Sequence, residues 1–379
     1  MTNKPKKIFI STGEASSDLY GAELATQLSK QNPLLAISGM GGAMMKKAGV
    51  NLIVDIKKLA VVGVIDVVKN LHKIFRTIKL IKYTLKQERP DLIILIDYPG
   101  VNLRLAKIAK QLGIKVLYYI SPKIWATRPG RIKIIKKYVD HMAVILPFEV
   151  KLYQQANVPV TFVGHPLLNL VKPSMSKSEA RKFFGFSPSD TLIGLMPGSR
   201  KSEIQYLLPI MLQTAEIIKR NFPQVQFALP LASTLQKDDL DDYLQKVTLP
   251  ITIIKNNHYD AMHICDAIIV ASGTATLEVT LLGVPLVIIY KTSAFNAFIA
   301  RRLLKVRFLG LANLIMNREI VPELLQEAAT PINIANATEK LLTDKFLQSK
   351  MIADLHLVKQ KLNVPVKMDI CEVAMKMLS

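Results

Sequence analysis

The segment TLIGLMPGSR, residues 191–200, is a short apolar run that ends in a turn of small residues, and AIIVASGTATLE, residues 267–278, repeats this arrangement. Each pattern predicts a buried strand, a tight turn and the first turn of a helix. Backbone N–H groups at a helix start and the positive end of the helix dipole attract anions, so two such turns predict a diphosphate site. The turn residues expected at the diphosphate are Gly198, Ser199, Ser272, Gly273 and Thr274. Glu278 lies about one helical turn further on, where its carboxylate can accept both hydroxyls of a ribose, and the whole pattern therefore predicts a nucleoside diphosphate that carries a sugar.

Apolar runs of strand length alternate with helical patterns along the whole chain. In the first half the expected strands cover residues 7–12, 91–97, 115–120 and 141–146, and the expected helices cover about 18–30, 103–112 and 131–137. In the second half the strands cover residues 191–196, 225–230, 267–271 and 285–291, and the helices cover about 203–221 and 238–245 plus the one that carries Glu278. This alternation predicts an α/β fold with two Rossmann-like domains, each a parallel sheet wrapped by helices.

The turn Gly164-His165-Pro166 and the polar run at residues 172–178 together form the best candidate linker. We therefore expect one domain at residues 1–168 and a second at residues 169–349. Ligands of open parallel sheets bind outside the carboxyl ends of the strands, and the motifs of both halves follow such ends. The active site is expected in the cleft between the two domains.

Composition narrows the classes of function. The chain has 379 residues, 50% of them hydrophobic, which is enough for two cores. Its 50 Lys and Arg against 29 Asp and Glu give a net charge of +21, which predicts attraction to polyanions. Aromatic residues are not interleaved with the cations and no nucleic-acid module is recognisable, so we expect no nucleic-acid partner. Cys265 and Cys371 lie far apart in apolar stretches, which indicates free thiols in a reducing compartment.

The start of the chain is polar and lysine-rich, without an apolar signal segment, and no uncharged run reaches the ~18 residues of a spanning helix. We therefore expect a cytoplasmic protein that does not cross a membrane. Residues 59–86 nevertheless suggest contact with a membrane surface, because apolar residues recur there at three- and four-residue steps opposite a basic face. The apolar positions are Val64, Val67, Val68, Leu71, Ile74, Phe75, Ile78 and Ile81.

This stripe has two interpretations. It either packs on a sheet with its cations merely solvated, or it forms an interfacial helix on anionic lipid. The apolar run at residues 59–65 and the basic charge of the whole chain favour the second interpretation. The expected membrane contacts are Val64, Val67, Val68, Leu71 and Phe75.

Residues 13–18 follow the first expected strand, in the position of a dinucleotide-binding fingerprint. The glycines of that fingerprint are absent and no acidic ribose partner follows at the expected distance, so no redox cofactor is expected. Capping of the first helix by Ser16, Ser17 or Asp18 explains the same polar residues without a ligand. Asp97 ends the apolar strand at residues 92–96, where desolvation can raise its pKa into the range of a general base. The alternative is a turn-forming Asp before Pro99, and position alone leaves both readings open.

Several other residues also have both a functional and a structural reading. Trp125 either stacks on a sugar or fills a core gap, and Arg128, Arg131 and Lys133 either meet an acceptor phosphate or form a solvated face. His165 is either structural or sugar-contacting. The run Asp239-Leu240-Asp241 matches a D-x-D metal motif, but it lies at an expected helix start, where capping explains it. His258 and His263 lack a spacing suited to one metal, so we expect no metal ion and no cofactor.

Segments along nearly the whole chain together resemble the lipid-A-disaccharide synthases, bacterial glycosyltransferases that join two acylated glucosamines. The matching segments are GEAS (13–16), LAVVG (59–63), IDYP (96–99), SPKIWA (121–126), LPFE (146–149), GHP (164–166), PGSR (197–200), ASGTATLE (271–278) and LANL (311–314). The chain departs from the usual family pattern at Ser17, Gly100, Val101, Thr127 and Asn169. All but the last of these lie in the first half, whereas the donor turns match.

The resemblance implies a GT-B fold whose C-terminal helix, about residues 350–379, returns to the first domain. It implies an inverting hexosyltransferase that uses UDP-2,3-diacylglucosamine as donor and 2,3-diacylglucosamine 1-phosphate (lipid X) as acceptor, with a β-1,6 disaccharide and UDP as products. Asp97 is then the base, and Arg200 and Asn313 contact the UDP. On the acceptor side we place Glu14, Ser16, Trp125, Arg128, Arg131 and His165. The resemblance also implies peripheral association with the inner face of the cytoplasmic membrane of a Gram-negative bacterium, and it is compatible with a homodimer.

Two other classes of function remain open. One is a different GT-B enzyme that uses UDP-N-acetylglucosamine, either a transferase to another lipid or a 2-epimerase. An epimerase needs several carboxylates near the anomeric carbon, and the first half offers chiefly Glu14 and Asp97. The other class is a non-catalytic UDP-binding paralogue, which predicts UDP binding without product.

Overall fold

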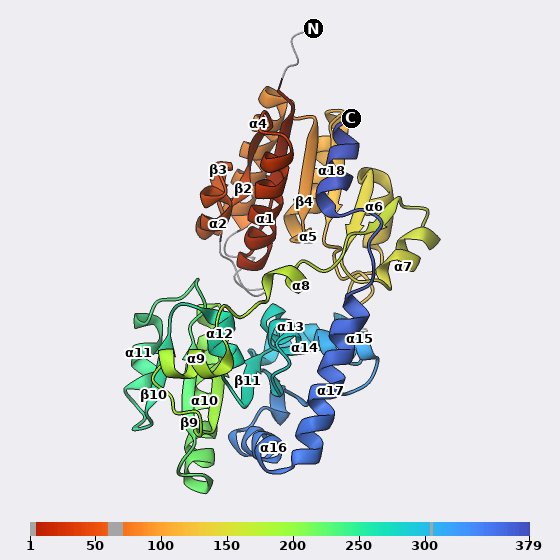
Figure 1. Ribbon diagram of the computed structural model, residues 1–379. Coiled ribbons are helices and arrows are strands. Elements are labelled where there is room, and N and C mark those ends of the chain that lie inside the picture. The colour runs from red at the N-terminus through yellow and green to blue at the C-terminus, as the bar shows by residue number, and fades with distance from the viewer. Residues whose placement is uncertain (1–4, 60–70, 304–305) are drawn as a thin grey trace. The chain divides into compact units, whose positions relative to one another are not determined.

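The structure is a computed structural model that describes residues 5–59, 71–303 and 306–379. The chain divides into two compact units, the first comprising Met1–Pro166 with Val364–Ser379 and the second Leu167–Asn363. Each unit contains a parallel sheet flanked by helices, which confirms the α/β class expected from the sequence (Figure 1).

The sheet of the first unit has the order β3-β2-β1-β4-β5-β6-β7. Its strands are β1 (Lys7–Ser11), β2 (Ala36–Gly41), β3 (Asn51–Asp55), β4 (Leu92–Ile96), β5 (Lys115–Tyr119), β6 (His141–Val144) and β7 (Val160–Phe162). Its helices are α1 (Ala15–Gln31), α2 (Ala43–Lys47), α4 (Leu71–Glu88), α5 (Pro99–Gln111), α6 (Arg131–Tyr138), α7 (Glu149–Gln155) and α18 (Ile370–Leu378), with a 3₁₀ turn η1 (Ile56–Leu59). The order reverses between β1 and β4, which pair in parallel, so ligands are expected at the carboxyl ends of these two strands.

The sheet of the second unit has the order β10-β9-β8-β11-β12-β13. Its strands are β8 (Leu192–Met196), β9 (Gln226–Pro230), β10 (Ile251–Ile254), β11 (Ala267–Ala271), β12 (Leu286–Tyr290) and β13 (Glu323–Leu325). Its helices are α8 (Leu167–Leu170), α9 (Lys177–Phe183), α10 (Lys201–Asn221), α11 (Asp238–Leu244), α12 (His258–His263), α13 (Thr274–Leu281), α14 (Ala294–Leu303), α15 (Leu311–Met316), α16 (Pro331–Thr343) and α17 (Lys345–Leu362), with a 3₁₀ turn η2 (Gln326–Ala328). Here the order reverses between β8 and β11.

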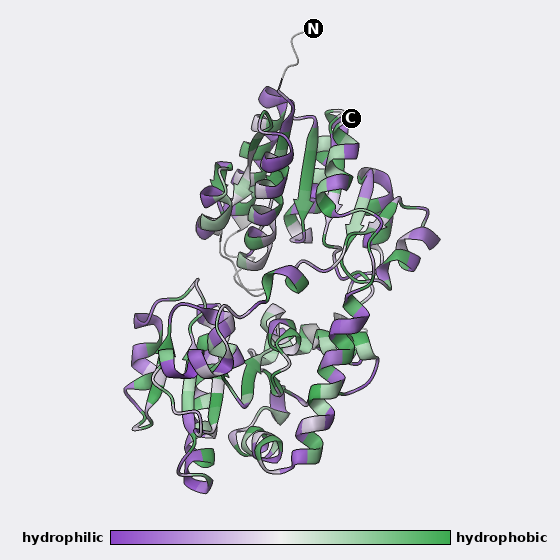
Figure 2. Cartoon of the chain, in the orientation of Figure 1, coloured by the Kyte–Doolittle hydropathy of each residue, from purple (hydrophilic) through white to green (hydrophobic). Residues whose placement is uncertain are grey.

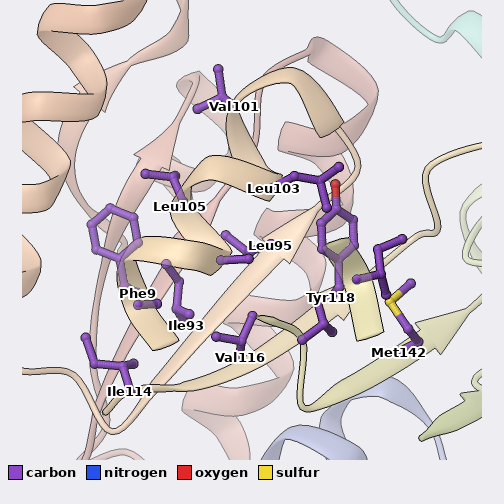
Figure 3. Packing of buried hydrophobic residues seen from close by; sticks show 14 of the residues in the cluster. Phe9, Ile93, Leu95, Val101, Leu103, Leu105, Ile114, Val116, Tyr118 and Met142 are labelled. Atoms are coloured by element: carbon purple, nitrogen blue, oxygen red, sulfur yellow. The ribbon is translucent and has the colours of Figure 1, made fainter. Parts of the chain in front are cut away.

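The central strands form the cores of both units. Every residue of β4, β8 and β11 is buried, because parallel strands between two helical layers have no solvent-facing side. Figure 2 shows β4 in green, whereas many outer helices carry purple, hydrophilic segments. In the first unit, side chains of β1, β4, β5 and α5 interdigitate in one cluster, seen around Phe9, Ile93, Leu95, Leu105 and Tyr118 in Figure 3.

The C-terminal residues return to the first unit, as the α18 contacts with α1, β4 and β5 show (Figure 1). We expected a single returning helix over about residues 350–379. Instead, α17 packs on α13, α15 and α16 within the second unit, and the return begins at Val364. Asp369 then caps α18 by accepting the N–H of Glu372 at 2.8 Å, so the chain folds as two helices rather than one.

The amphipathic stripe lies partly in α4. Val64, Val67, Val68 and the side chain of Leu71 fall outside the described residues. Of the rest, Ile74 and Ile81 are buried in the core and Ile78 packs against it, so the packing interpretation is correct for these three. Phe75 is 56% exposed, with the Arg104 guanidinium 5.5 Å from its ring centroid. None of the helices in the described ranges combines the length and the apolar run that crossing a bilayer requires.

Candidate active site

Asp97 lies at the carboxyl end of β4, at the reversal of strand order in the first unit. Its N–H continues the sheet by donating to the Tyr119 carbonyl oxygen at 3.0 Å. Asp97 and Tyr98 then both adopt left-handed backbone, with φ of 48° and 47°. For residues other than glycine this conformation costs about 1–2 kcal/mol, although Asp tolerates it better than most. Two consecutive residues of this kind mark a strained turn, and such turns are common at functional sites.

The electrostatic environment holds the Asp97 carboxyl ready to exchange a proton near neutral pH. Burial, and to a lesser extent the negative charge of Glu14, together raise the pKa of Asp97 from 3.8 to about 6. The Tyr98 N–H and the cations Lys123 and Arg131 act in the opposite direction. The carboxyl therefore has the properties of a general base.

The turn after β1 packs directly on this site. A Cβ atom placed on Gly13 would lie 2.1 Å from Cγ of Tyr98, so only glycine leaves room for the ring. The Ser17 hydroxyl accepts the N–H groups of Gly13 and Glu14 at 3.2 and 3.0 Å, and the Asp18 carboxylate accepts three N–H groups at the start of α2. Ser17 and Asp18 are thus structural, but the N-cap of α1 is Glu14 rather than Ser16, Ser17 or Asp18, and Asp18 binds the start of α2 instead. Glu14 is exposed and Ser16 is half-buried, and these two remain candidates for ligand contact.

Trp125 is anchored by the buried carboxyl of Glu149, a residue that the sequence analysis named only as part of the LPFE segment. Its Nε1 donates to Oε1 of Glu149 at 3.0 Å, and its ring meets Phe148 edge-on at 5.2 Å. Glu149 is 2% exposed, and burial raises its pKa to about 7. Hydrogen bonds from Trp125, the Leu146 N–H and Ser121 lower this pKa but do not offset the effect of burial. Both readings of Trp125 remain open, because the indole is half-buried and anchored at one edge.

The basic residues of the first unit gather near the same strand ends. Lys123 and Arg128 are exposed, Arg131 is half-buried, and the positive charges of Lys123 and Arg131 both act on Asp97. His165 is buried, and both its burial and Lys123 lower its pKa to about 4, so its ring is neutral at physiological pH. The first unit therefore brings Glu14, Asp97, Lys123 and Arg131 into one electrostatic neighbourhood.

The two predicted phosphate turns lie side by side in the second unit. Strands β8 and β11 are neighbours, with Met196 paired to Val270, so the turns that follow them leave the sheet at the same edge. Gly198 adopts a φ of 115°, which favours glycine, and Gly273 is exposed at the start of α13. Glu278 lies in α13, and burial raises its pKa to about 7.

In the turn after β8, the expected diphosphate site is occupied by a carboxylate of the protein, that of Glu203. Glu203 accepts the Ser199 N–H at 2.9 Å through Oε2 and the Arg200 guanidinium at 2.8 Å through Oε1. A Cβ atom on Gly198 would lie 2.2 Å from Oε2 of Glu203. A glutamate three residues into a helix is a recognised capping signal, so the sequence contained this information although we did not use it. The turn is built to hold negative charge.

Asn313, expected from the family resemblance to contact the UDP, lies in a hydrogen-bond network within the second unit. Its side chain is fully buried: Nδ2 donates to the Val321 carbonyl oxygen and to Glu323, while Oδ1 accepts the N–H groups of Ile320 and Val321. Both ends of the amide are thus hydrogen-bonded within the chain, and the side chain ties α15 to the segment that leads into β13. Among the described residues, no group of three or more His, Cys, Asp or Glu side chains could hold a metal ion.

Comparison with known sequences gives consistent results. The family model described as "Lipid-A-disaccharide synthetase" matches residues 8–374. The chain is 49% identical over 341 residues to a lipid-A-disaccharide synthase of Trichlorobacter lovleyi, covering 90% of this chain and 89% of that one. It is 45% identical over 378 residues to the enzyme of the same name from Nitrosococcus oceani, covering 100% and 98%.

Comparison with solved structures supports the fold. A structure of S. aureus MnaA with UDP has a TM-score of 0.65 at 10% identity and covers 96% of this chain and 100% of its own. The UDP-GlcNAc 2-epimerase from Neisseria meningitidis bound to UDP-GlcNAc has a TM-score of 0.60 at 14% identity, covering 94% and 99%. These likenesses extend over both units and confirm the GT-B architecture.

Proposed function

Since the chain belongs to the lipid-A-disaccharide synthetase family and is a glycosyltransferase, we propose that it transfers 2,3-diacylglucosamine from UDP to the 6-hydroxyl of 2,3-diacylglucosamine 1-phosphate. The products are the β-1,6-linked disaccharide 1-phosphate and UDP. The observation that carries this proposal is the Asp97 carboxyl, held on a strained turn at the reversal of strand order with its pKa raised to about 6.

Asp97 acts as the general base. As the acceptor oxygen attacks the anomeric carbon of the donor, its proton passes to the Asp97 carboxylate, and the bond from that carbon to the UDP oxygen breaks in one inverting displacement. The cations near Asp97 suit a phosphorylated acceptor, because Lys123 and Arg131 can meet its 1-phosphate while the base stays ionised.

The second unit binds the donor. Ser199, Arg200 and the start of α13 supply N–H groups and a guanidinium to the diphosphate, so the leaving UDP gains stabilisation as its charge develops. Glu278 accepts the ribose hydroxyls. The Glu203 carboxylate now bound to Ser199 and Arg200 has to give up part of this contact when a diphosphate arrives.

A product assay tests the proposal. The purified protein is incubated with UDP-2,3-diacylglucosamine and the acyl monosaccharide 1-phosphate, and the products are separated by mass. We expect disaccharide 1-phosphate and UDP in equal amounts. Free sugar released from UDP, without acceptor, supports the epimerase-like alternative, and UDP binding without any product supports the non-catalytic one.

We also propose that the protein acts as a peripheral protein on the inner face of the cytoplasmic membrane, where both lipid substrates reside. The net charge of +21 favours anionic lipid, and the exposed Phe75 follows the apolar run at residues 59–65 in the sequence. A homodimer is compatible with this arrangement.

Changing Val64, Val68 and Leu71 together to serine is expected to reduce co-sedimentation with vesicles containing anionic lipid by about tenfold or more, because each removed side chain contributes about 1.5–3 kcal/mol of apolar burial when fully inserted. Sedimentation of protein with and without vesicles measures this. The control is Phe346→Ser, which removes a 79% exposed aromatic side chain of α17 in the second unit. Equal vesicle binding by the triple variant and the wild type contradicts the proposed contact.

A further inference from the structure

The turn that carries Asp97 is held by hydrogen bonds from two side chains that have no role in the proposed reaction. Asn102, in the first turn of α5, is fully buried. Its Nδ2 donates to the carbonyl oxygens of Asp97 at 2.7 Å, Ile96 at 3.2 Å and Ser11 at 3.4 Å, while Oδ1 accepts the Ser11 hydroxyl at 2.7 Å. One amide therefore joins the last residues of β1 and β4 at the point where the strand order reverses.

Tyr118, on the neighbouring strand β5, is the second residue that holds this turn by a hydrogen bond. Its ring is fully buried in the core of the first unit (Figure 3), and its hydroxyl donates to the Asp97 carbonyl oxygen at 2.6 Å. That oxygen thus accepts two hydrogen bonds from buried side chains, one from α5 and one from β5. Because the carbonyl is part of the peptide between Asp97 and Tyr98, the two bonds fix the orientation of that peptide plane.

The direction of the Asp97 carboxylate depends on this peptide plane. Neither Asp97 nor Tyr98 is a glycine, so the left-handed turn is not favoured by the backbone itself and relaxes unless its surroundings hold it. A change of φ or ψ at Asp97 swings the Cα–Cβ bond and carries the carboxyl away from its present place among Glu14, Lys123 and Arg131. Sequence spacing alone does not suggest this role, because Asn102 and Tyr118 lie five and 21 residues away from Asp97.

We propose that Asn102 and Tyr118 are positioning residues for the base: they hold the strained Asp97–Tyr98 turn so that the carboxylate meets the acceptor hydroxyl in the correct direction. This inference rests on Asp97 being the base of the proposed reaction. It also explains why a large buried tyrosine on β5 directs its hydroxyl to a backbone oxygen of the neighbouring strand's turn.

The test compares Tyr118→Phe with Tyr119→Phe. Both remove one hydroxyl from a buried tyrosine of β5, but alternation along the strand places Tyr119 on the opposite face of the sheet, near α1 and α18. For Tyr118→Phe we expect kcat to fall about tenfold, or about 1.4 kcal/mol, with KM within twofold. We also expect the acid limb of the kcat–pH profile to move to lower pH, because a carboxyl released from its buried position is better solvated. Tyr119→Phe should change neither quantity.

A second variant and a folding control make the result decisive. Asn102→Ser removes the amide donor and should lower kcat more than Tyr118→Phe, while UDP affinity, which is determined in the second unit, stays unchanged and reports an intact fold. Retention of wild-type kcat and acid limb in both variants overturns the inference, as does a fall in Tm alone. Asp97→Asn is measured alongside. If it turns over at a near-normal rate, Asp97 is not the base. If it is inactive while Tyr118→Phe and Asn102→Ser are unaffected, Asp97 remains the base and only the positioning role is overturned.

Discussion

Replacement of Asp97 by asparagine is expected to lower kcat by at least ~100-fold while UDP affinity remains at the wild-type value, because general base catalysis contributes ~10²–10⁴ in rate. Asparagine has the same shape and tolerates left-handed backbone, so the turn at φ 48° survives and the loss reflects chemistry. Steady-state kinetics with both lipid substrates measure kcat, and calorimetric titration with UDP measures affinity.

The matched control is Asp91→Asn, at the residue that precedes the same strand at its opposite end. Asp91 accepts the Lys7 N–H at 2.8 Å and pairs with Lys6 at 3.5 Å, near the surface and away from the carboxyl end of β4. Its kcat should stay within twofold of wild type. Comparable losses in both variants, or near-normal turnover by Asp97→Asn, would show that the Asp97 carboxylate is not the base.

Asp97→Asn should also increase the stability of the folded protein above pH 6. Because the pKa of Asp97 is raised from 3.8 to about 6 in the folded protein, the folded state binds its proton more tightly than the unfolded state. Stability therefore falls as pH rises through this window, and above pH 6 the ionised carboxyl costs up to about 3 kcal/mol. Asp97→Asn removes this cost, so its Tm at pH 7.5 should exceed that of wild type. In the wild type, kcat should fall as pH drops below about 6, because the base becomes protonated.

The alternation of strands and helices could be predicted where the strands are largely buried. The strands β1, β4, β5, β6, β8, β9, β11 and β12 were all expected, because each is a mostly apolar run. Strand β2 was not expected, because Ser38, Gly39 and Gly41 interrupt its apolar pattern. Gly39 is required there, since a Cβ atom would lie 2.1 Å from the Ile10 carbonyl oxygen, a contact visible only in three dimensions. The three-residue strands β7 and β13 at the sheet edges are half-buried and too short to show a period.

The candidate site residues that the sequence predicts best are those that directly follow strands. Asp97, the turn at Gly198 and the turn at Gly273 were identifiable because carboxyl ends of parallel strands share one edge. Asn102, Tyr118 and Glu149 were not, because their roles come from contacts with residues of other elements or distant loops, as when Glu149 accepts from Trp125 24 residues away. Asn313 was proposed at the nucleotide from the family resemblance alone, and sequence did not predict the internal hydrogen bonds that its amide makes with Ile320 and Val321.

Arg200→Ala should produce the largest effect on the donor side. We expect UDP affinity to fall ~10- to 100-fold, because charge-assisted hydrogen bonds contribute about 1.5–3 kcal/mol. kcat should fall as well, since the guanidinium also stabilises the charge that develops on the leaving UDP. Titration with UDP and single-turnover kinetics measure the two effects separately. Arg220→Ala, in the last turn of the same helix α10, is the control and should bind UDP normally.

The contact of Glu203 with Arg200 allows a test of whether the diphosphate binds where the Glu203 carboxylate now lies. In Arg200→Ala the Glu203 carboxylate still accepts the Ser199 N–H, but its charge is no longer balanced by the guanidinium, so it repels the incoming diphosphate. Adding Glu203→Gln to Arg200→Ala should therefore restore part of the UDP affinity, although Glu203→Gln alone loosens the turn of the wild type. If the double variant binds UDP more tightly than the sum of the single losses predicts, the Glu203 carboxylate and the diphosphate compete for the same place. Strictly additive losses would mean that Arg200 and Glu203 act on UDP independently, and that the diphosphate does not occupy the turn that Glu203 now fills.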